Sequence, residues 1–183
     1  FSASLLEELL KEAARTVHFE GDDLIIDHVY IERRMTPLNL YLRSASREDA
    51  EKAVIEYGQA IRDLAVTNIF PGDLLLKNFG VTRHGRVIFY DYDELCLVTD
   101  CRFREIPQSQ HDEDDMRADA WFYVGESDVF PETFINFLGF DPQLKQVLLD
   151  AHAEVLTAEW WRGIQERLRE GELLEVLPYH RHR

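Results

Sequence analysis

The chain has 183 residues, of which 45% are apolar and 11% aromatic, a composition that predicts a folded globular protein with one substantial core. Its 35 acidic residues against 20 lysines and arginines give a formal charge of −15, which argues against nucleic acid as a partner because that binding depends on cations that neutralise phosphates. No apolar run approaches the ~20 residues that a membrane-spanning helix needs, so we expect a soluble, cytoplasmic protein that does not bind a membrane.

The first stretch, residues 2–15, has leucines at the spacing of one helix face, with Ser2 or Ser4 as its cap. Residues 17–19 and 24–32 flank the turn sequence EGDD, which predicts a β-hairpin. Thr36-Pro37 is expected to break the second strand. Because the chain opens at Phe1 without Met or a targeting signature, we expect it to be a piece of a longer protein.

A long amphipathic helix is predicted from Ser46 to about Thr67. Ser46 and Asp49 form a start that resembles a capping box. Apolar residues then recur on one face, at positions 50, 54, 57, 61, 64 and 65. We expect this helix to be a buried support for the segment that follows it, with no chemical role of its own.

The next segment, IFPGDLLLKNFGVTRHGRVIFYDYDE (69–94), is predicted to form a loop followed by a hairpin. Pro71-Gly72 predicts a sharp turn at its start, and Leu74 to Leu76 are expected to anchor the loop in the core. The loop is followed by a short strand, a turn and a second strand, at residues 79–81, 83–85 and 87–90.

Four polar side chains surround this hairpin. Asp73 and Asn78 lie five residues apart in the loop, and Asp91 and Asp93 directly follow the second strand. One hairpin could therefore bring all four together. Phosphoryl transfer needs such a set, because an Asp orients the attacking hydroxyl while an amide and a carboxylate hold Mg²⁺.

The order and spacing of these residues resemble the catalytic loop and D-F-G segment of protein kinases, with FPGD (70–73) where H-R-D stands and DYD (91–93) in place of D-F-G. YIERRMTPLNLYL (30–42), residues 68–94 and DVFPE (128–132) resemble the C-terminal lobe of the bacterial isocitrate dehydrogenase kinase/phosphatase family. The resemblance covers nearly the whole chain. It implies a bifunctional enzyme that uses ATP or ADP with Mg²⁺ or Mn²⁺ to phosphorylate and dephosphorylate a serine of isocitrate dehydrogenase, which switches carbon flow between the citric acid cycle and the glyoxylate bypass.

The fold class that this resemblance implies is α+β and mainly helical. Residues 1–32 would be a short N-lobe remnant with a helix and two strands, and residues 33–183 a protein-kinase-like C-lobe. The parts of that lobe would be a hinge at 32–36, a catalytic loop at 70–80, a metal-binding D-Y-D at 91–93 and a helical part at 131–170. The implied partners are isocitrate dehydrogenase as protein substrate and a missing N-terminal part of the same enzyme, and a homodimer is left open.

The resemblance also implies residue roles. Asp73 would be the base or orienter of the attacking oxygen, and Asn78 and Asp91 would hold the metal. Asp93 stands where kinases have Gly and would serve water activation in the phosphatase direction, the alternative being a cap for the following turn. Lys77 lies four residues after Asp73, whereas the kinase lysine lies two after, and it would contact a phosphate.

At the implied hinge, Glu32, Arg34 and Met35 are the residues expected to bind the nucleotide. The alternative for Arg34 is a solvated turn. In the first helix, Glu8 or Glu12 would face the lysine that contacts ATP in kinases, unless both only lie on an exposed helix face.

Beyond the hairpin, Cys96 and Cys101 are the only cysteines, too few for a zinc site or a disulfide framework, so we expect reduced, structural thiols. The acidic run 112–115 is expected to be a solvated loop, with a second metal site as the alternative. Residues 121–123 (WFY) would dock this loop or present a surface to the protein substrate. The tail contains His180 and His182, to which we assign no zinc.

Three helical stretches are predicted near the C-terminus, at residues 134–138, 142–156 and 158–169. Trp160, Trp161, Ile164 and Leu168 share one face there and are expected to pack. We expect the acidic excess to aid solubility, with a basic patch on a protein partner as the alternative.

The sequence contains neither a glycine-rich phosphate loop nor a strand lysine, which kinases need. We therefore expect these residues alone to bind ATP weakly and to be inactive. Two other function classes stay open: a catalytically dead kinase-like scaffold, and a metal-dependent phosphoprotein phosphatase built on D-x-D.

Overall fold

The computed structural model describes residues 1–28, 34–107 and 122–172. The chain divides into two compact units, Phe1–Arg33 and Arg34–Arg183, and it combines helices with small sheets, as the α+β prediction required. None of the helices in the described ranges has both the length and the apolar character to cross a membrane.

The first unit holds one helix and one hairpin. Helix α1 (Ala3–Glu12) begins at Ser2, whose Oγ accepts a hydrogen bond from the amide of Leu5 at 3.3 Å, and it ends earlier than predicted. Strands β1 (Val17–Glu20) and β2 (Asp23–Ile26) pair antiparallel around Gly21, which has φ of +62°. The predicted second strand is thus shorter, and residues 29–32 lie outside the described ranges.

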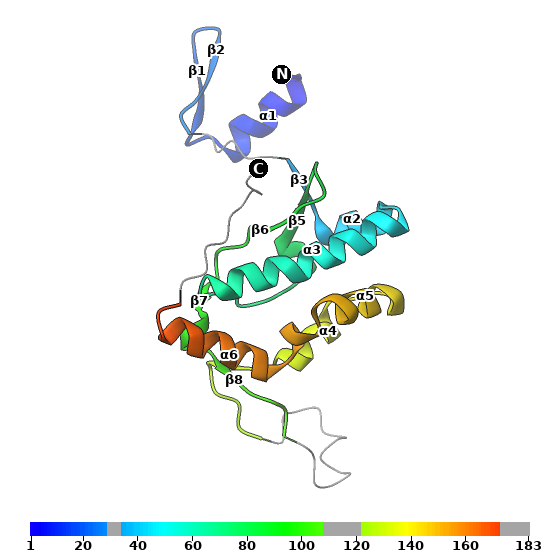
Figure 1. Cartoon of the computed structure of the whole chain (residues 1–183). Coiled ribbons are helices and arrows are strands. Elements are labelled where there is room, and N and C mark those ends of the chain that lie inside the picture. Colours follow the sequence, from blue (N-terminus) through cyan, green and yellow to red (C-terminus); the bar gives the residue numbers. More distant parts are fainter. Residues whose placement is uncertain (29–33, 108–121, 173–183) are drawn as a thin grey trace, which may run out of the picture. The chain divides into compact units, whose positions relative to one another are not determined.

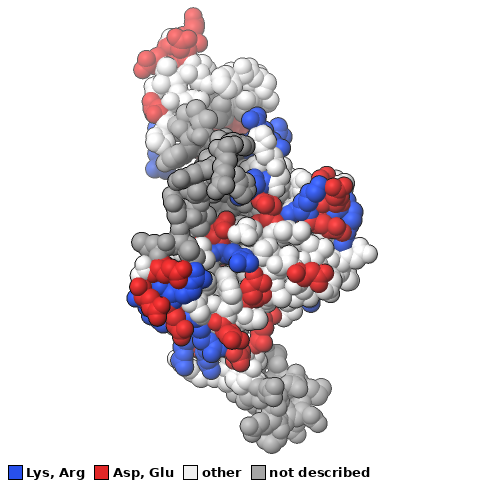
Figure 2. Space-filling view, in the orientation of Figure 1, with Lys and Arg blue, Asp and Glu red and all other residues white. Residues whose placement is uncertain are grey.

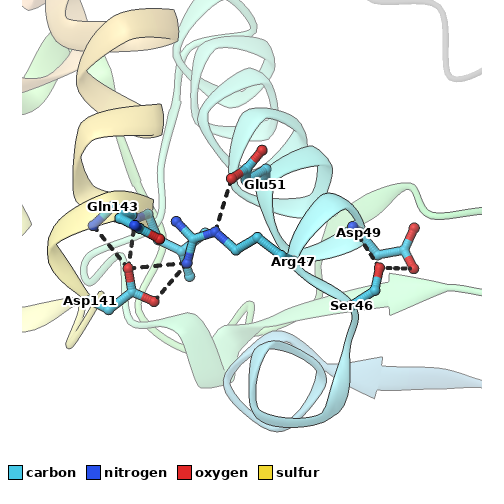
Figure 3. A network of polar contacts seen from close by, with 7 residues as sticks. Ser46, Arg47, Asp49, Glu51, Asp141 and Gln143 are labelled. Carbon is cyan, nitrogen blue, oxygen red and sulfur yellow. Dashed lines mark hydrogen bonds and ion pairs between the residues drawn. The ribbon is translucent and has the colours of Figure 1, made fainter.

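Helix α3 (Arg47–Val66) lies at the centre of the second unit. The Oγ of Ser46 accepts a hydrogen bond from the amide of Asp49 at 3.2 Å and donates one to its carboxylate at 2.7 Å, so the predicted helix start is confirmed (Figure 3). Its buried residues are Ala50, Ala53, Val54, Tyr57, Gly58, Ile61 and Ala65. The helix lies between the hairpin strands and the C-terminal helices (Figure 1).

A three-stranded antiparallel sheet covers one side of α3, in the order β3 (Met35–Pro37), β5 (Phe79–Thr82) and β6 (Val87–Phe89). The predicted hairpin is confirmed, with the pair Phe79↔Phe89 nearest its open end. A strand does end at Pro37, but Thr36 and Pro37 belong to it instead of interrupting it, because Thr36 pairs with Val81 and Pro37 with Gly80. Proline is tolerated there since β3 is an edge strand. Helix α2 (Leu38–Ser44), which the sequence analysis did not predict, follows at once.

The C-terminal part is helical, as predicted. It comprises the 3₁₀ turn η3 (Pro131–Thr133), α4 (Phe134–Phe137), α5 (Pro142–His152), the 3₁₀ turn η4 (Ala153–Leu156) and α6 (Ala158–Arg169). The predicted helix 142–156 therefore changes to a tighter turn after His152.

A polar network ties the start of α5 to the start of α3 (Figure 3). The Oδ1 of Asp141 accepts hydrogen bonds from the amides of Gln143 and Leu144, both at 2.9 Å. Arg47 reaches across to Asp141 at 3.0 Å and also contacts Glu51 at 2.9 Å. The network fixes how the two helices meet, because Asp141 is both the cap of one helix and the ion-pair partner of the other.

Trp161 lies in the middle of an aromatic cluster. It is fully buried, it stacks on Phe103 at 4.8 Å between ring centroids, and its Nε1 donates to the carbonyl of Val155 at 2.8 Å. Phe70 packs edge-on against it at 5.6 Å. The packing role predicted for this helix face is confirmed for Trp161 and Ile164, which are buried, and for Trp160 and Leu168, which are partly buried.

Two short strand pairs complete the second unit. Strand β4 (Ile69–Phe70) pairs antiparallel with β7 (Cys96–Leu97), and β8 (Arg102–Phe103) pairs parallel with β9 (Asp128–Val129). The β4–β7 pair joins the start of the segment 69–94 to the residues just after its end, so both arms of the predicted site lead back to one strand pair.

Charged side chains of both signs are interspersed on the face of the second unit seen in Figure 2. Several acidic residues of this unit have basic partners, among them Asp141 with Arg47, Glu48 with Lys52 and Glu172 with Arg167.

Candidate functional site

The candidate site begins with a sharp turn at Pro71-Gly72, as predicted. Gly72 has φ of +75°, and a Cβ added to it would lie 2.7 Å from the carbonyl oxygen of Glu94. The amide of Asp73 donates to the carbonyl of Pro71 at 2.9 Å. A glycine is therefore required where the loop passes against the end of the 91–94 segment.

Asp73 and Asn78 meet directly in this loop. The side-chain amide of Asn78 donates to Oδ1 of Asp73 at 2.6 Å, and the amide of Leu75 donates to the same oxygen at 3.0 Å. Asn78 is buried within the short 3₁₀ helix η1 (Leu76–Asn78), and Asp73 is half-buried. The spacing of five residues thus closes the loop through its own side chains.

Leu74 and Leu76 anchor the loop in the core, as predicted, and Leu75 is half-buried. A contact that the sequence did not reveal comes from α3. The hydroxyl of Tyr57, a fully buried residue, donates to the carbonyl of Leu74 at 2.6 Å, while its ring packs edge-on against Phe79 at 4.7 Å.

Burial raises the pKa of Tyr57 well above its usual value, and the charge of Asp73 adds to this effect. The hydroxyl therefore stays protonated and remains a donor. Sequence periodicity placed Tyr57 on the buried face of the helix, but it could not show that the hydroxyl reaches the residue after Asp73.

The antiparallel register ties the start of D-Y-D to Asn78 through the backbone. The amide of Tyr90 donates to the backbone carbonyl of Asn78 at 3.1 Å, and Asp91 is the next residue. The hydroxyl of Tyr90 also hydrogen-bonds the carbonyl of Lys77, and burial together with Asp91 raises the pKa of Tyr90. One backbone hydrogen bond and one side-chain hydrogen bond of Tyr90 therefore join the loop to the residue just before D-Y-D.

Asp91 is half-buried, whereas Asp93 and Lys77 are exposed. Within the described ranges, the carboxylates of Asp91 and Asp93 have no hydrogen-bond or ion-pair partner. Asp93 thus accepts no backbone amide there, as a cap of the following turn would. The structure joins Asp73 to Asn78 directly and ties the backbone of Asn78 to Tyr90, just before Asp91, while Asp93 is exposed.

The donor set fits a hard divalent cation. The side-chain oxygen of Asn78 receives no hydrogen bond from the residues that the structure describes, and Asp91 offers a carboxylate; Mg²⁺ is bound by such oxygen ligands together with substrate phosphates. No group of three or more His, Cys, Asp or Glu side chains in the described part is arranged to hold a metal. Mg²⁺ that shares its shell with phosphates needs no such cage.

The predicted nucleotide-binding residues are described only in part. Met35 is half-buried in β3 opposite Thr82, and Arg34 is exposed. Glu32 lies outside the described ranges, as do the acidic run 112–115, Trp121, His180 and His182. Phe122 packs on Phe130 at 5.4 Å between centroids, whereas Tyr123 is 82% exposed.

The sequence of the chain matches one known protein family over almost its whole length. A family model described as the isocitrate dehydrogenase kinase/phosphatase (AceK) kinase domain matches residues 1–181. Curated relatives called isocitrate dehydrogenase kinase/phosphatase are 53% identical over 179 residues in Anaeromyxobacter sp. (strain Fw109-5), 49% over 183 residues in Methylibium petroleiphilum and 48% over 180 residues in Yersinia enterocolitica. These matches cover 98%, 100% and 98% of this chain but only 31%, 30% and 31% of the relatives, so the chain spans about a third of their length.

Proposed function

The chain belongs to the isocitrate dehydrogenase kinase/phosphatase family, and from this premise we propose that it carries the Mg²⁺-dependent phosphoryl-transfer site of a bifunctional enzyme. That enzyme phosphorylates a serine of isocitrate dehydrogenase from ATP and also removes the phosphate, which switches carbon flow between the citric acid cycle and the glyoxylate bypass. The observation that carries the proposal is the Asp73–Asn78 hydrogen bond at the base of the loop, together with the backbone hydrogen bond from Tyr90, the residue before Asp91, to Asn78.

In this proposal Asp73 orients the attacking hydroxyl and accepts its proton. Its Oδ1 already accepts two hydrogen bonds from within the loop, so Oδ2 is the oxygen that faces the substrate hydroxyl. The hydroxyl of Tyr57 holds the carbonyl of Leu74 and thereby limits how far the carboxylate can turn. Lys77, exposed on η1, contacts a phosphate oxygen.

Asn78 and Asp91 would hold Mg²⁺ or Mn²⁺, and when bound, the ion neutralises the charge that develops on the phosphates. Because Asn78 gives its amide protons to Asp73, its carbonyl oxygen is the atom left for the ion. The same hydrogen bond thus sets both the base and one metal ligand.

Asp93 would supply the base for hydrolysis, since removal of a phosphate needs an activated water where phosphorylation uses a substrate hydroxyl. Its exposure and the absence of a partner within the described ranges leave the carboxylate available to a water molecule.

In the proposed architecture, the unit Phe1–Arg33 contains the end of a kinase-like N-lobe and the remaining residues form the C-lobe. The hinge residues Glu32, Arg34 and Met35 would then lie at the adenine of ATP or ADP. These 183 residues have no glycine-rich loop, so we expect them alone to bind nucleotide weakly.

The test measures Mg²⁺-dependent ATP binding by calorimetry on two proteins: this chain, and a longer protein that contains it and matches its relatives in length. Each is measured with and without Asp91→Ala. Tight binding only by the longer protein, weakened by the substitution, is the expected result. Asp100→Ala, which removes an exposed carboxylate outside the loop, is the matched control and should leave binding unchanged. If Asp91→Ala also changes nothing, the loop is not a metal site and a scaffold role takes its place.

A further inference from the structure

The two cysteines of the chain lie side by side. The Sγ atoms of Cys96 and Cys101 are 3.6 Å apart, and both are free thiols. They are the only cysteines in the sequence. Cys101 is buried, as a structural thiol would be, whereas Cys96 is exposed.

The two thiols differ in how firmly they are held. Gln165, buried on α6, donates its amide to the carbonyls of Cys101 at 2.8 Å and of Val98 at 2.7 Å. The thiol of Cys101 points to the carbonyl of Leu97 at 3.5 Å. Burial, followed by the hydrogen bond and charge of Cys96, raises the pKa of Cys101 to about 12. Cys96 is therefore the thiol that an oxidant in solution reaches first.

The pair is also attached to the candidate site. Cys96 is the strand partner of Phe70, which directly precedes the Pro71-Gly72 turn and Asp73. On the other side of Cys96, the carbonyl of Glu94 lies against Gly72. A change in the backbone at Cys96 is therefore passed to the base of the loop through the β4–β7 pair.

We propose that Cys96 and Cys101 form a reversible oxidation site whose closure to a disulfide shifts the β4–β7 pair and with it the loop that carries Asp73. A disulfide needs its sulfur atoms about 2.0 Å apart, so the two thiols must approach from their present contact. Since Cys101 is anchored by Gln165, the movement falls on Cys96 and its strand.

The oxidant is hydrogen peroxide. Cys96 attacks one peroxide oxygen, the O–O bond breaks, and an S–O bond forms to give a sulfenic acid and one water. Cys101 then attacks the sulfur of Cys96, the S–O bond breaks, and the S–S bond forms with release of a second water. Both thiol protons end in water, and the two sulfur atoms together lose two electrons.

The experiment is mass spectrometry of the chain after treatment with hydrogen peroxide. The expected product has lost two hydrogen atoms, its peptide map joins Cys96 to Cys101, and dithiothreitol restores the original mass. Cys101→Ser should stop at a sulfenic acid on Cys96 that a dimedone probe traps, and Cys96→Ser should leave Cys101 unmodified. Oxidation of the unaltered chain to a sulfinic acid without a cross-link, or reaction of Cys101 in Cys96→Ser, would overturn the proposal.

Hydrogen exchange tests the link to the loop. Amides of residues 69–73 should exchange faster in the oxidised chain than in the reduced chain, whereas those in the middle of α5, remote in sequence from the pair, should not change. Unchanged exchange in residues 69–73 despite a formed disulfide would refute the link. Neither readout involves nucleotide or substrate, so failure here is distinct from failure of the phosphoryl-transfer proposal.

Discussion

The side-chain amide of Asn78 donates a hydrogen bond of 2.6 Å to Oδ1 of Asp73, which stands five positions earlier in the loop. The carboxylate can only accept, so the nitrogen of the amide must face it and the oxygen must face the other way. One contact therefore orients two side chains of different chemistry. The predictions that follow test this contact and the structure that supports it.

Replacement of Asp73 by Ala in the protein at the length of its relatives should lower phosphorylation of isocitrate dehydrogenase by roughly 10²- to 10⁴-fold, the usual contribution of a general base. Transfer of labelled phosphate from ATP measures it. Asp22→Ala, which removes an exposed carboxylate from the first hairpin, is the control. Full activity in Asp73→Ala would favour the scaffold alternative.

Asp93→Ala should separate the two directions, because only hydrolysis needs a water to be activated at that carboxylate. We expect dephosphorylation of phosphorylated isocitrate dehydrogenase to fall far more than phosphorylation does, measured on the same preparation. Equal losses in both directions would contradict the assigned role. Dephosphorylation by the unaltered protein in the absence of ATP and ADP would instead point to a metal phosphatase that needs no nucleotide.

Tyr57→Phe should destabilise the chain by about 1–3 kcal/mol, because it leaves the buried carbonyl of Leu74 without its donor. Chemical denaturation measures the free energy of unfolding. Tyr41→Phe is the matched control, since the hydroxyl of Tyr41 makes no hydrogen bond within the described ranges, and it should change stability by less than about 0.5 kcal/mol. Similar losses of unfolding free energy in the two variants would show that the hydrogen bond from Tyr57 to Leu74 does not stabilise the fold.

Gly72→Ala should destabilise the fold more than Gly85→Ala does. Both glycines have nearly the same backbone conformation, with φ of +75° and +77°, so both variants lose about 1–2 kcal/mol from the left-handed conformation. Only at Gly72 would the new methyl group meet a backbone oxygen, that of Glu94, whereas nothing lies within 4 Å at Gly85. Equal losses in the two unfolding curves would contradict the close contact between the loop and the 91–94 segment.

The network of Figure 3 predicts a dependence of stability on acid. The pKa of Asp141 is lowered by the hydrogen bond from the amide of Leu144 and by Arg47. The unfolded chain then binds more protons, so this stabilisation is present above the ordinary aspartate pKa of about 3.9 and is lost as the pH falls through the lower folded value. Unfolding midpoints from neutral pH downward measure it. Asp141→Asn should lose stability less steeply with acid, while Asp22→Asn should follow the unaltered chain.

Local chemistry made several features predictable from the sequence. The start of α3 at Ser46, its buried face and the turn at Pro71-Gly72 depend on residues within a few positions of one another. The same holds for the hairpin and for the Asp73–Asn78 spacing. The family could also be recognised from the sequence, because the residues that identify it fall in three uninterrupted segments, 30–42, 68–94 and 128–132.

Other features depend on residues far apart in the chain, and only the tertiary structure decided them. Thr36 is a strand residue because β5 offers it an edge, which overrides the expected effect of Pro37. The hydroxyl of Tyr57 reaches the carbonyl of Leu74 from a different element. The thiols of Cys96 and Cys101 meet because β4 pairs with the strand of Cys96 while Gln165 of α6 holds the backbone of Cys101. Sequence patterns report which face of an element is buried, whereas the partner of a buried polar group is set by the packing of elements that the chain brings together only on folding.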